Sequence, residues 1–282
     1  MACSLAPQLI LCEAFVLADR TIDSSRHISR VAKTSRNWLG LGSLIAGLLA
    51  WWAIARFSGL PSFILPSPAQ VWTRFLRALF DGTLLLDTGV TLFEIMTGLL
   101  VGALTATVLG YLVAKSRALE RILSPYLVAS QAIPLVAIAP LLVIWFGPGI
   151  FSKILICALI VFFPVLVNTV VGVRAVPTAL YDLMGSLRAT RGQILLKLEI
   201  PAALPVFLGG LRIGATLSVI GAVVGELVGA DMGLGFLINV GRGQYDTALV
   251  FVAVFTLIVL ALALYGIVAW AEKKLLSWQE TR

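Results

Sequence analysis

Four ionisable residues stand out because they lie in stretches that are otherwise apolar: Asp87, Glu94, Arg212 and Glu226. An ionisable group inside a membrane is energetically costly, so such residues are candidates for a functional site. A simpler explanation competes for each. Glu94 and Arg212 lie near the ends of their stretches, where a long side chain can reach the headgroup region, and this explanation is favoured for Arg212. Glu226 precedes the loop Gly233-Leu234-Gly235 and can cap it or pair there.

Two amides and two prolines complete the set of candidate residues. Gln131 and Asn168 are polar positions in apolar helices, and interhelical hydrogen bonding is the predicted task of both. Pro134 and Pro140 each remove a helix hydrogen bond, so their helix is expected to be kinked or partly unwound and to form a pathway wall. The pathway candidates are therefore Gln131, Pro134, Pro140, Asn168, Arg212 and Glu226.

The chain lacks the motifs of a catalytic or nucleotide-binding site. Neither G-x-S-x-G nor H-E-x-x-H nor a buried pair of aspartates occurs, which argues against an intramembrane hydrolase. The run GPGIFSK at residues 147–153 is only superficially like a phosphate-binding loop, so any step driven by ATP would need another subunit. Cys3, Cys12, Cys157 and His27 show no metal-ligand spacing, so no metal site, disulfide framework or cofactor is expected in this chain.

The composition identifies a membrane protein. Of 282 residues, 60% are apolar and 12% are charged, whereas about 25% are charged in soluble domains. Six stretches approach the roughly 20 apolar residues of a spanning helix: 38–57, 91–114, 122–146, 150–173, 203–228 and 248–270. The predicted fold class is an all-α polytopic membrane protein with six transmembrane helices. Its permease domain is expected at 38–274, after a flexible extension at 1–37 and before a tail at 275–282.

Lysine and arginine residues indicate how the spans are oriented. If the N-terminus lies in the cytoplasm, the cytoplasmic segments carry 15 of these residues and the outer segments five, including Lys153. Cytoplasmic loops of membrane proteins are enriched in Lys and Arg, so both termini are expected inside the plasma (inner) membrane. The net charge of +7 has the same explanation and does not indicate a nucleic-acid partner.

The fifth stretch is rich in glycine. Small residues four apart let helices approach closely, and tight packing is favoured here over a pathway face. The residues concerned are Gly209, Gly210, Gly214, Gly221, Gly225 and Gly229.

The longest interruption of the apolar pattern, residues 177–205, predicts two short helices outside the bilayer. Pro177 begins this stretch, and a proline is well tolerated in the first turn of a helix. Apolar residues follow it at helical spacing. Thr190 and Gln193 have the spacing of a capping box, so a second helix is expected over residues 191–199 until Pro201 ends it. Such a hairpin can dock into a groove of another protein, and a loop lying on the membrane surface is an equal alternative.

The same segment resembles the cytoplasmic loop of ABC-importer permeases, whose pattern is E-A-A, three residues, Gly, nine residues and I-x-L-P. Residues 182–184 lie on the E-A-A and residues 198–201 on the closing I-x-L-P. Arg188 replaces the family glycine, and this departure affects the turn between the helices. The resemblance implies that a coupling hairpin at 177–201 contacts the ATPase, through Asp182, Leu183, Met184, Arg188, Gln193, Lys197 and Pro201.

Further segments are similar to the nitrate, sulfonate and taurine branch of these permeases. They include LPSFILPSP at residues 60–68, residues 133–142, residues 162–169 and Gly233-Leu234-Gly235. The resemblance implies a type I ABC importer permease fold, with this chain as half of a homodimer or of a paired permease. The implied partners are cytoplasmic ATPase subunits, which use ATP and Mg²⁺, and an extracytoplasmic substrate-binding protein.

The expected function is therefore a non-enzymatic permease subunit that translocates a small nutrient. A vitamin such as riboflavin or a pyrimidine precursor of thiamine is favoured, because the intramembrane charges form no clear cationic ring; a sulfonate, taurine or nitrate-type anion is the alternative. A stand-alone secondary transporter or channel is an alternative of another class. It would need no docking hairpin and would be expected to show charge relays or inverted repeats, which the sequence does not clearly show.

Overall fold

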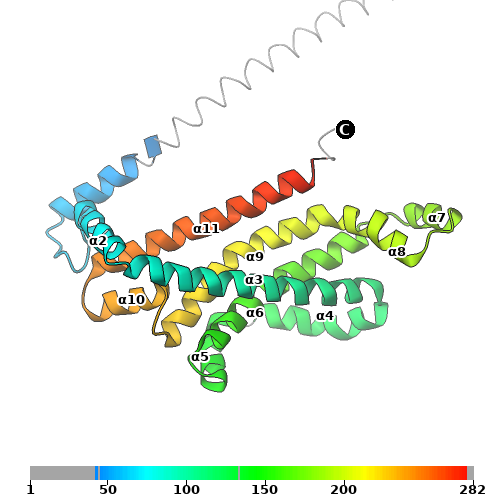
Figure 1. Cartoon of the computed structure of the whole chain (residues 1–282), viewed down its shortest axis with the longest axis horizontal. Coiled ribbons are helices and arrows are strands. Elements are labelled where there is room, and N and C mark those ends of the chain that lie inside the picture. Colours follow the sequence, from blue (N-terminus) through cyan, green and yellow to red (C-terminus); the bar gives the residue numbers. More distant parts are fainter. Residues whose placement is uncertain (1–41, 44, 133, 278–282) are drawn as a thin grey trace, which may run out of the picture. The chain divides into compact units, whose positions relative to one another are not determined.

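The computed structural model describes residues 42–277 except 44 and 133, so the predicted extension at 1–37 and the last residues of the predicted tail lie outside the described residues (Figure 1). Every regular element in the described part is a helix, as predicted. The chain divides into two compact units, one ending at Pro68 and the other beginning at Ala69.

The first unit contains the apolar helix Ile45–Phe57, which covers the second half of the first predicted span. The indole Nε1 of Trp51 donates a hydrogen bond of 3.2 Å to the carbonyl of Pro66, so the following loop folds back on this helix. In the second unit, α2 (Pro68–Phe80) buries Val71 and Ala78. It lies between the first two predicted spans.

Four helical segments among the described residues are long and apolar enough to cross a membrane. They are α3 (Thr83–Lys115), α6 (Ile150–Arg174), Arg191–Gly229, which ends with α9 (Ile200–Gly229), and α11 (Thr247–Leu275). They overlap the second, fourth, fifth and sixth predicted spans. The second begins earlier than predicted, because α3 starts directly after Gly82, which has a left-handed φ of 76°.

The third predicted span is two helices rather than one. α4 (Arg117–Ala132) ends before Pro134 and α5 (Leu135–Phe146) begins directly after it, and Pro134 itself adopts an extended conformation with ψ of 108°. Pro134 therefore interrupts the helix, as a missing N–H predicts, while Pro140 lies inside α5 without ending it.

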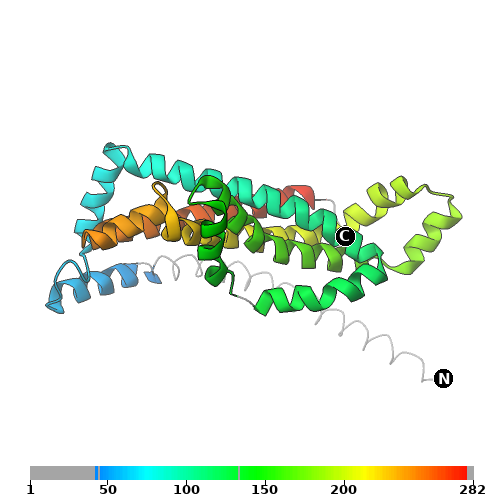
Figure 2. The ribbon, with the colours of Figure 1, turned by 90° about the horizontal axis from the view of Figure 1, so that it is seen from below.

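The directions of the long helices define two ends of the second unit (Figures 1 and 2). Lys115, the last residue of α3, contacts Glu199, which directly precedes α9, and this defines the hairpin end. Lys153, at the start of α6, contacts Glu94 in the first half of α3, close to the Gly233 loop, and this defines the Gly233 end. Hence α3 and α6 run in the same direction and α9 runs against both, while α4 and α5 together return the chain between the two ends.

Close approach of α6 and α9 forms the centre of this unit. A Cβ atom on Gly221 of α9 would lie 3.0 Å from the Cα of Cys157 on α6, and one on Gly172 of α6 would lie 2.9 Å from the carbonyl oxygen of Ala203 on α9. The predicted packing role of the glycines is therefore confirmed for most of the set, whereas Gly209 has no neighbour within 4 Å. The adjacent buried core consists of Ala106, Val161, Val165 and Leu166.

The predicted end of the hairpin at Pro201 is wrong. After α8 (Arg191–Ile194), the helix continues through a π-helical turn, η1 (Leu195–Glu199), directly into α9. The N–H of Ile200 bonds to the carbonyl of Leu195, five residues back, and Pro201 follows as one of the first residues of α9. A proline is tolerated there, because the missing N–H falls at the change of hydrogen-bond register.

Candidate functional site

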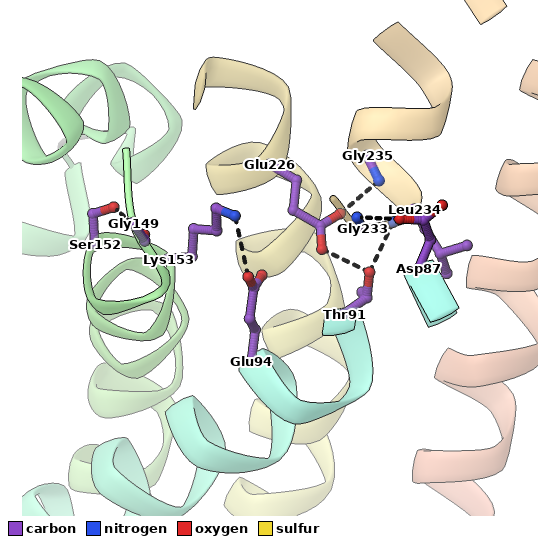
Figure 3. Close-up of polar contacts among 10 residues, drawn as sticks. All are labelled: Asp87, Thr91, Glu94, Gly149, Ser152, Lys153, Glu226, Gly233, Leu234 and Gly235. Atoms are coloured by element: carbon purple, nitrogen blue, oxygen red, sulfur yellow. Dashed lines mark hydrogen bonds and ion pairs between the residues drawn. The ribbon is translucent and has the colours of Figure 1, made fainter. Parts of the chain in front are cut away.

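The Gly233 end holds a buried polar cluster built from α3, α6, α9 and the loop before α10 (Leu234–Gly243), shown in Figure 3. Glu226 is fully buried near the end of α9. The hydroxyl of Thr91 donates to its Oε1 at 2.6 Å, and the backbone N–H of Gly235 donates to its Oε2 at 2.5 Å. Each oxygen of this carboxylate therefore accepts a short hydrogen bond, one from a backbone N–H and one from a short side chain. This agrees with the capping role considered from the sequence.

The glycine loop fits closely around these acceptors. The N–H of Gly233 donates to Oδ1 of Asp87 at 2.7 Å, and the N–H of Leu234 donates to the hydroxyl oxygen of Thr91 at 2.8 Å. Gly233 has a φ of 115°, and a Cβ there would overlap the carboxylate of Glu226. A Cβ on Gly235 would lie 2.7 Å from the Cβ of Glu226. Both positions therefore require glycine.

Glu94 and Lys153 form a buried ion pair beside Glu226 (Figure 3). Their charged atoms lie 3.3 Å apart, and the two side chains are 0% and 5% exposed. The suggestion that Glu94 reaches the headgroup region is wrong, and so is the count of Lys153 among outer-loop cations. Both errors arise because the pairing depends on how α3 and α6 pack. The sequence did offer one signal for this ion pair, because Glu94 and Lys153 are oppositely charged and lie at similar depths in two apolar stretches.

The hairpin formed by α7 (Thr178–Ser186) and α8 lies at the other end (Figure 2). Asp182 and Leu183 are exposed and Met184 is half-buried. Arg188, at the position of the family glycine, has a left-handed φ of 52°. The turn therefore keeps a conformation that favours glycine, although arginine occupies it.

The predicted capping box of α8 is confirmed. Gln193 Oε1 accepts a bond of 2.9 Å from the N–H of Thr190, and the Thr190 hydroxyl accepts one of 3.4 Å from the N–H of Gln193. Lys197 is exposed in η1.

The base of the hairpin contains a second buried carboxylate that the sequence analysis missed. Glu199 is 2% exposed and accepts hydrogen bonds from the Nζ of Lys115 and, at 3.0 Å, from the hydroxyl of Tyr111. The Lys115 ammonium also lies 5.1 Å from the ring centre of Tyr181 on α7. A cavity of about 420 Å³ adjoins these groups, between α3, α6 and α9, with Thr107, Thr169 and Phe207 among its lining residues.

Two groups outside the long helices at this end have perturbed pKa values. Hydrogen bonds from Arg174 lower the pKa of the exposed Glu120 below its ordinary value of 4.5. Burial, followed by the charge of Glu199, raises the pKa of Tyr181 above its ordinary value of 10.0.

The remaining pathway candidates do not converge on one site. Arg212 forms an ion pair with Glu272 of α11 and lies 5.1 Å from the ring centre of Tyr265, and its reach to the headgroup region stays a prediction. Asn168 donates to the carbonyl of Pro164 in its own helix at 2.8 Å, not to another helix. Gln131 lies in α4. Pro134 directly precedes α5 and Pro140 lies inside it, and both prolines are exposed.

Comparison with known proteins places these features in one family. The profile of the binding-protein-dependent transport system inner membrane component matches residues 98–277. The chain is 45% identical to the riboflavin transport system permease protein RibX of Chloroflexus aurantiacus, over 92% of this chain and 98% of that protein.

Two further relatives are more distant. The chain is 36% identical to the formylaminopyrimidine transport permease protein ThiX of Halalkalibacterium halodurans, over 83% and 92% of the two chains, and 32% identical to the taurine transport system permease protein TauC of Escherichia coli, over 93% and 98%. An inward-facing structure of the MetNI methionine ABC transporter matches 66% of this chain and 91% of its own, with a TM-score of 0.54 and 22% identity, which supports the fold. The chain therefore belongs to the family of binding-protein-dependent transport system inner membrane components, as a permease subunit of an ABC importer.

Proposed function

We propose that this chain is the permease subunit of a riboflavin importer. The observation that carries the proposal is the identity of 45% with a riboflavin permease, which extends over 92% of this chain and 98% of the relative. The matches to formylaminopyrimidine and taurine permeases are weaker at 36% and 32%. A thiamine pyrimidine precursor and a sulfonate are therefore the competing substrates.

The hairpin of α7 and α8 is the proposed docking element for an ATPase subunit. Large apolar side chains are exposed along the hairpin and the adjoining η1: Leu183 in α7, Leu187 directly after it and Leu196 in η1 are 54%, 69% and 66% exposed. No residue of α7 is buried. Exposed apolar side chains on a short polar-flanked helix are the surface expected for docking into a groove of another protein.

The proposed assembly follows from this contact. Two copies of the chain form the translocation unit, two ATPases bind at the hairpins, and a substrate-binding protein docks at the Gly233 end. The hairpin end faces the cytoplasm, because removing the buried Lys153 from the outer count leaves 15 cytoplasmic cations against four. ATP-driven closure of the ATPases moves the hairpins and switches the pathway between inward and outward opening.

Uptake into proteoliposomes that contain this chain, its ATPase and its binding protein tests the proposal. Riboflavin, formylaminopyrimidine and taurine are compared, with and without ATP and the binding protein. ATP-dependent uptake of riboflavin supports the proposal. Preferred uptake of formylaminopyrimidine or taurine would identify that compound as the substrate instead. Flux that needs neither partner would instead support a channel or secondary carrier. Deletion of residues 179–198 should abolish ATPase binding and leave membrane insertion intact.

A further inference from the structure

The hairpin is tied to the helix bundle at one polar point. Among the described residues, the side-chain hydrogen bonds and ion pairs that join residues 177–199 to α3 all involve Glu199, which is bonded by Lys115 and Tyr111. The other direct polar contact is the stacking of the Lys115 ammonium on the ring of Tyr181. One cation of α3 therefore contacts both arms of the hairpin, through Tyr181 on the first and Glu199 on the second.

The π-helical turn explains how Glu199 reaches this position. A π turn holds one residue more than an α turn, which rotates the following residues by about 100° relative to a regular helix. Here the turn ends at Glu199 itself. Its neighbours Lys197 and Ile200 are exposed, whereas Glu199 is 2% exposed and faces α3. Single π turns occur often at functional sites, because they aim one side chain away from its regular direction.

The contact is built from groups that can separate and meet again. Lys115 is 39% exposed and ends in a flexible ammonium group, and the tyrosine hydroxyl is also the far end of a side chain. The cavity of about 420 Å³ adjoins Tyr111, Leu195 and Glu199, so the helices are not tightly packed there. Apart from its continuous backbone connections to α6 and α9, the hairpin is thus held against α3 by this polar contact beside a cavity and not by an interdigitated core.

We propose that Glu199 is the positioning residue that transmits movement of the hairpin to α3, through Lys115 and Tyr111. This inference rests on the proposed docking of the ATPase at the hairpin. Breaking the contact leaves the hairpin connected to the bundle through the backbone of α6 and α9. The ATPase then moves the hairpin without moving α3 to the same extent, so ATP hydrolysis and transport become uncoupled.

The first test concerns the permease alone, as the full chain in lipid nanodiscs. Glu199→Gln should raise the hydrogen-exchange rate of the amides at residues 178–194 by about tenfold, since coupling between contacting residues commonly reaches the 1.4 kcal/mol that corresponds to a tenfold change. Lys273→Gln, which removes an exposed cation from α11, is the matched control and should change nothing. Unchanged exchange in the Glu199→Gln variant would overturn the inference, whether or not an ATPase binds.

The second test concerns the complex with the ATPase and the binding protein. Glu199→Gln should keep ATPase binding and lower the amount of substrate transported per ATP hydrolysed by about tenfold. Glu199→Lys should show the same defect, and the reversed pair Glu199→Lys with Lys115→Glu should restore much of the coupling, which a residue needed only for folding would not do. An unchanged ratio of transport to hydrolysis rejects transmission through Glu199. Failure of the unaltered chain to bind any ATPase would instead reject the proposed docking role, while the exchange test still decides whether Glu199 holds the hairpin.

Discussion

Two buried carboxylates lie at opposite ends of one continuous helical segment, Arg191–Gly229, and they are held in different ways. Glu226, at the Gly233 end, accepts from a backbone N–H of the glycine loop and from the short hydroxyl side chain of Thr91. Glu199, at the hairpin end, accepts from the tips of Lys115 and Tyr111. The exposed fractions of the two carboxylates are nearly equal, so the nature of the donors is what distinguishes the two ends.

The donors at the Gly233 end are fixed in position, and the residues Asp87, Thr91, Glu226 and Gly233 to Gly235 are called the clamp below. Backbone groups and a one-carbon hydroxyl side chain have little freedom to follow a moving acceptor, and the close contact of Gly233 with Glu226 leaves no space for adjustment. Long side chains at the hairpin end can follow a displacement and re-form their bonds. We therefore expect α3, α9 and α10 to keep fixed positions relative to one another at the Gly233 end, whereas the contact of Glu199 with α3 can persist through small displacements of the hairpin.

The largest effect is expected when the ion pair beside the clamp is broken. Lys153→Met leaves Glu94 buried without a cation and should lower the free energy of unfolding by about 3–5 kcal/mol. The double variant Glu94→Leu with Lys153→Met removes both charges and should lose much less, because an apolar pair of similar size can replace a buried ion pair. Denaturant unfolding in detergent, followed by tryptophan fluorescence, measures both. If the single and double variants lose equal amounts of unfolding free energy, Lys153 does not stabilise the chain by neutralising the buried charge of Glu94.

Substitution of the loop glycine tests the rigidity of the clamp itself. Gly233→Ala places a Cβ against the carboxylate of Glu226 at a φ of 115°, so steric overlap and backbone strain together should cost roughly 2–4 kcal/mol of unfolding free energy. Gly243→Ala is the matched control, because a Cβ there meets no atom within 4 Å. The control should be neutral or slightly stabilising in the same unfolding assay. A mild effect at Gly233 would mean that the loop yields, and the contrast between the two ends would weaken.

The sequence predicted the elements better than it predicted their contacts. Long apolar stretches and a capping box are local signals, so the long helices and the start of α8 were found from composition and spacing. The bond from Lys115 to Glu199 joins residues 84 positions apart, and no local pattern in the sequence pairs these two residues. Pro201 was wrongly expected to end a helix, since the π-helical turn that accommodates it has no local signature.

A smaller, pH-dependent effect is expected from the exposed pair of Arg174 and Glu120 at the hairpin end. The pKa of Glu120 is lowered in the folded chain. The pair therefore contributes its full stabilisation of the fold at a pH above the ordinary pKa of 4.5, and this contribution is lost as the pH falls through the lowered pKa. Glu120→Gln should therefore lower the thermal midpoint at neutral pH and have no effect at a pH below the lowered pKa. A difference between the two chains that stays constant over this range would exclude the pair as its cause.

The smallest effect is expected at the turn of the hairpin, where Arg188 has a φ of 52°. A left-handed conformation costs a non-glycine residue about 1–2 kcal/mol, and glycine loses roughly 0.5–1 kcal/mol more conformational entropy on folding. Arg188→Gly should therefore stabilise the closed hairpin by about 0.5 kcal/mol and slow hydrogen exchange at residues 178–194 slightly. Ala189→Gly, next to it, should have the opposite sign, because glycine brings only its entropic cost where φ is not left-handed. Because the gain arises inside the hairpin, it should persist in a Glu199→Gln background, which separates the internal order of the hairpin from its attachment to α3.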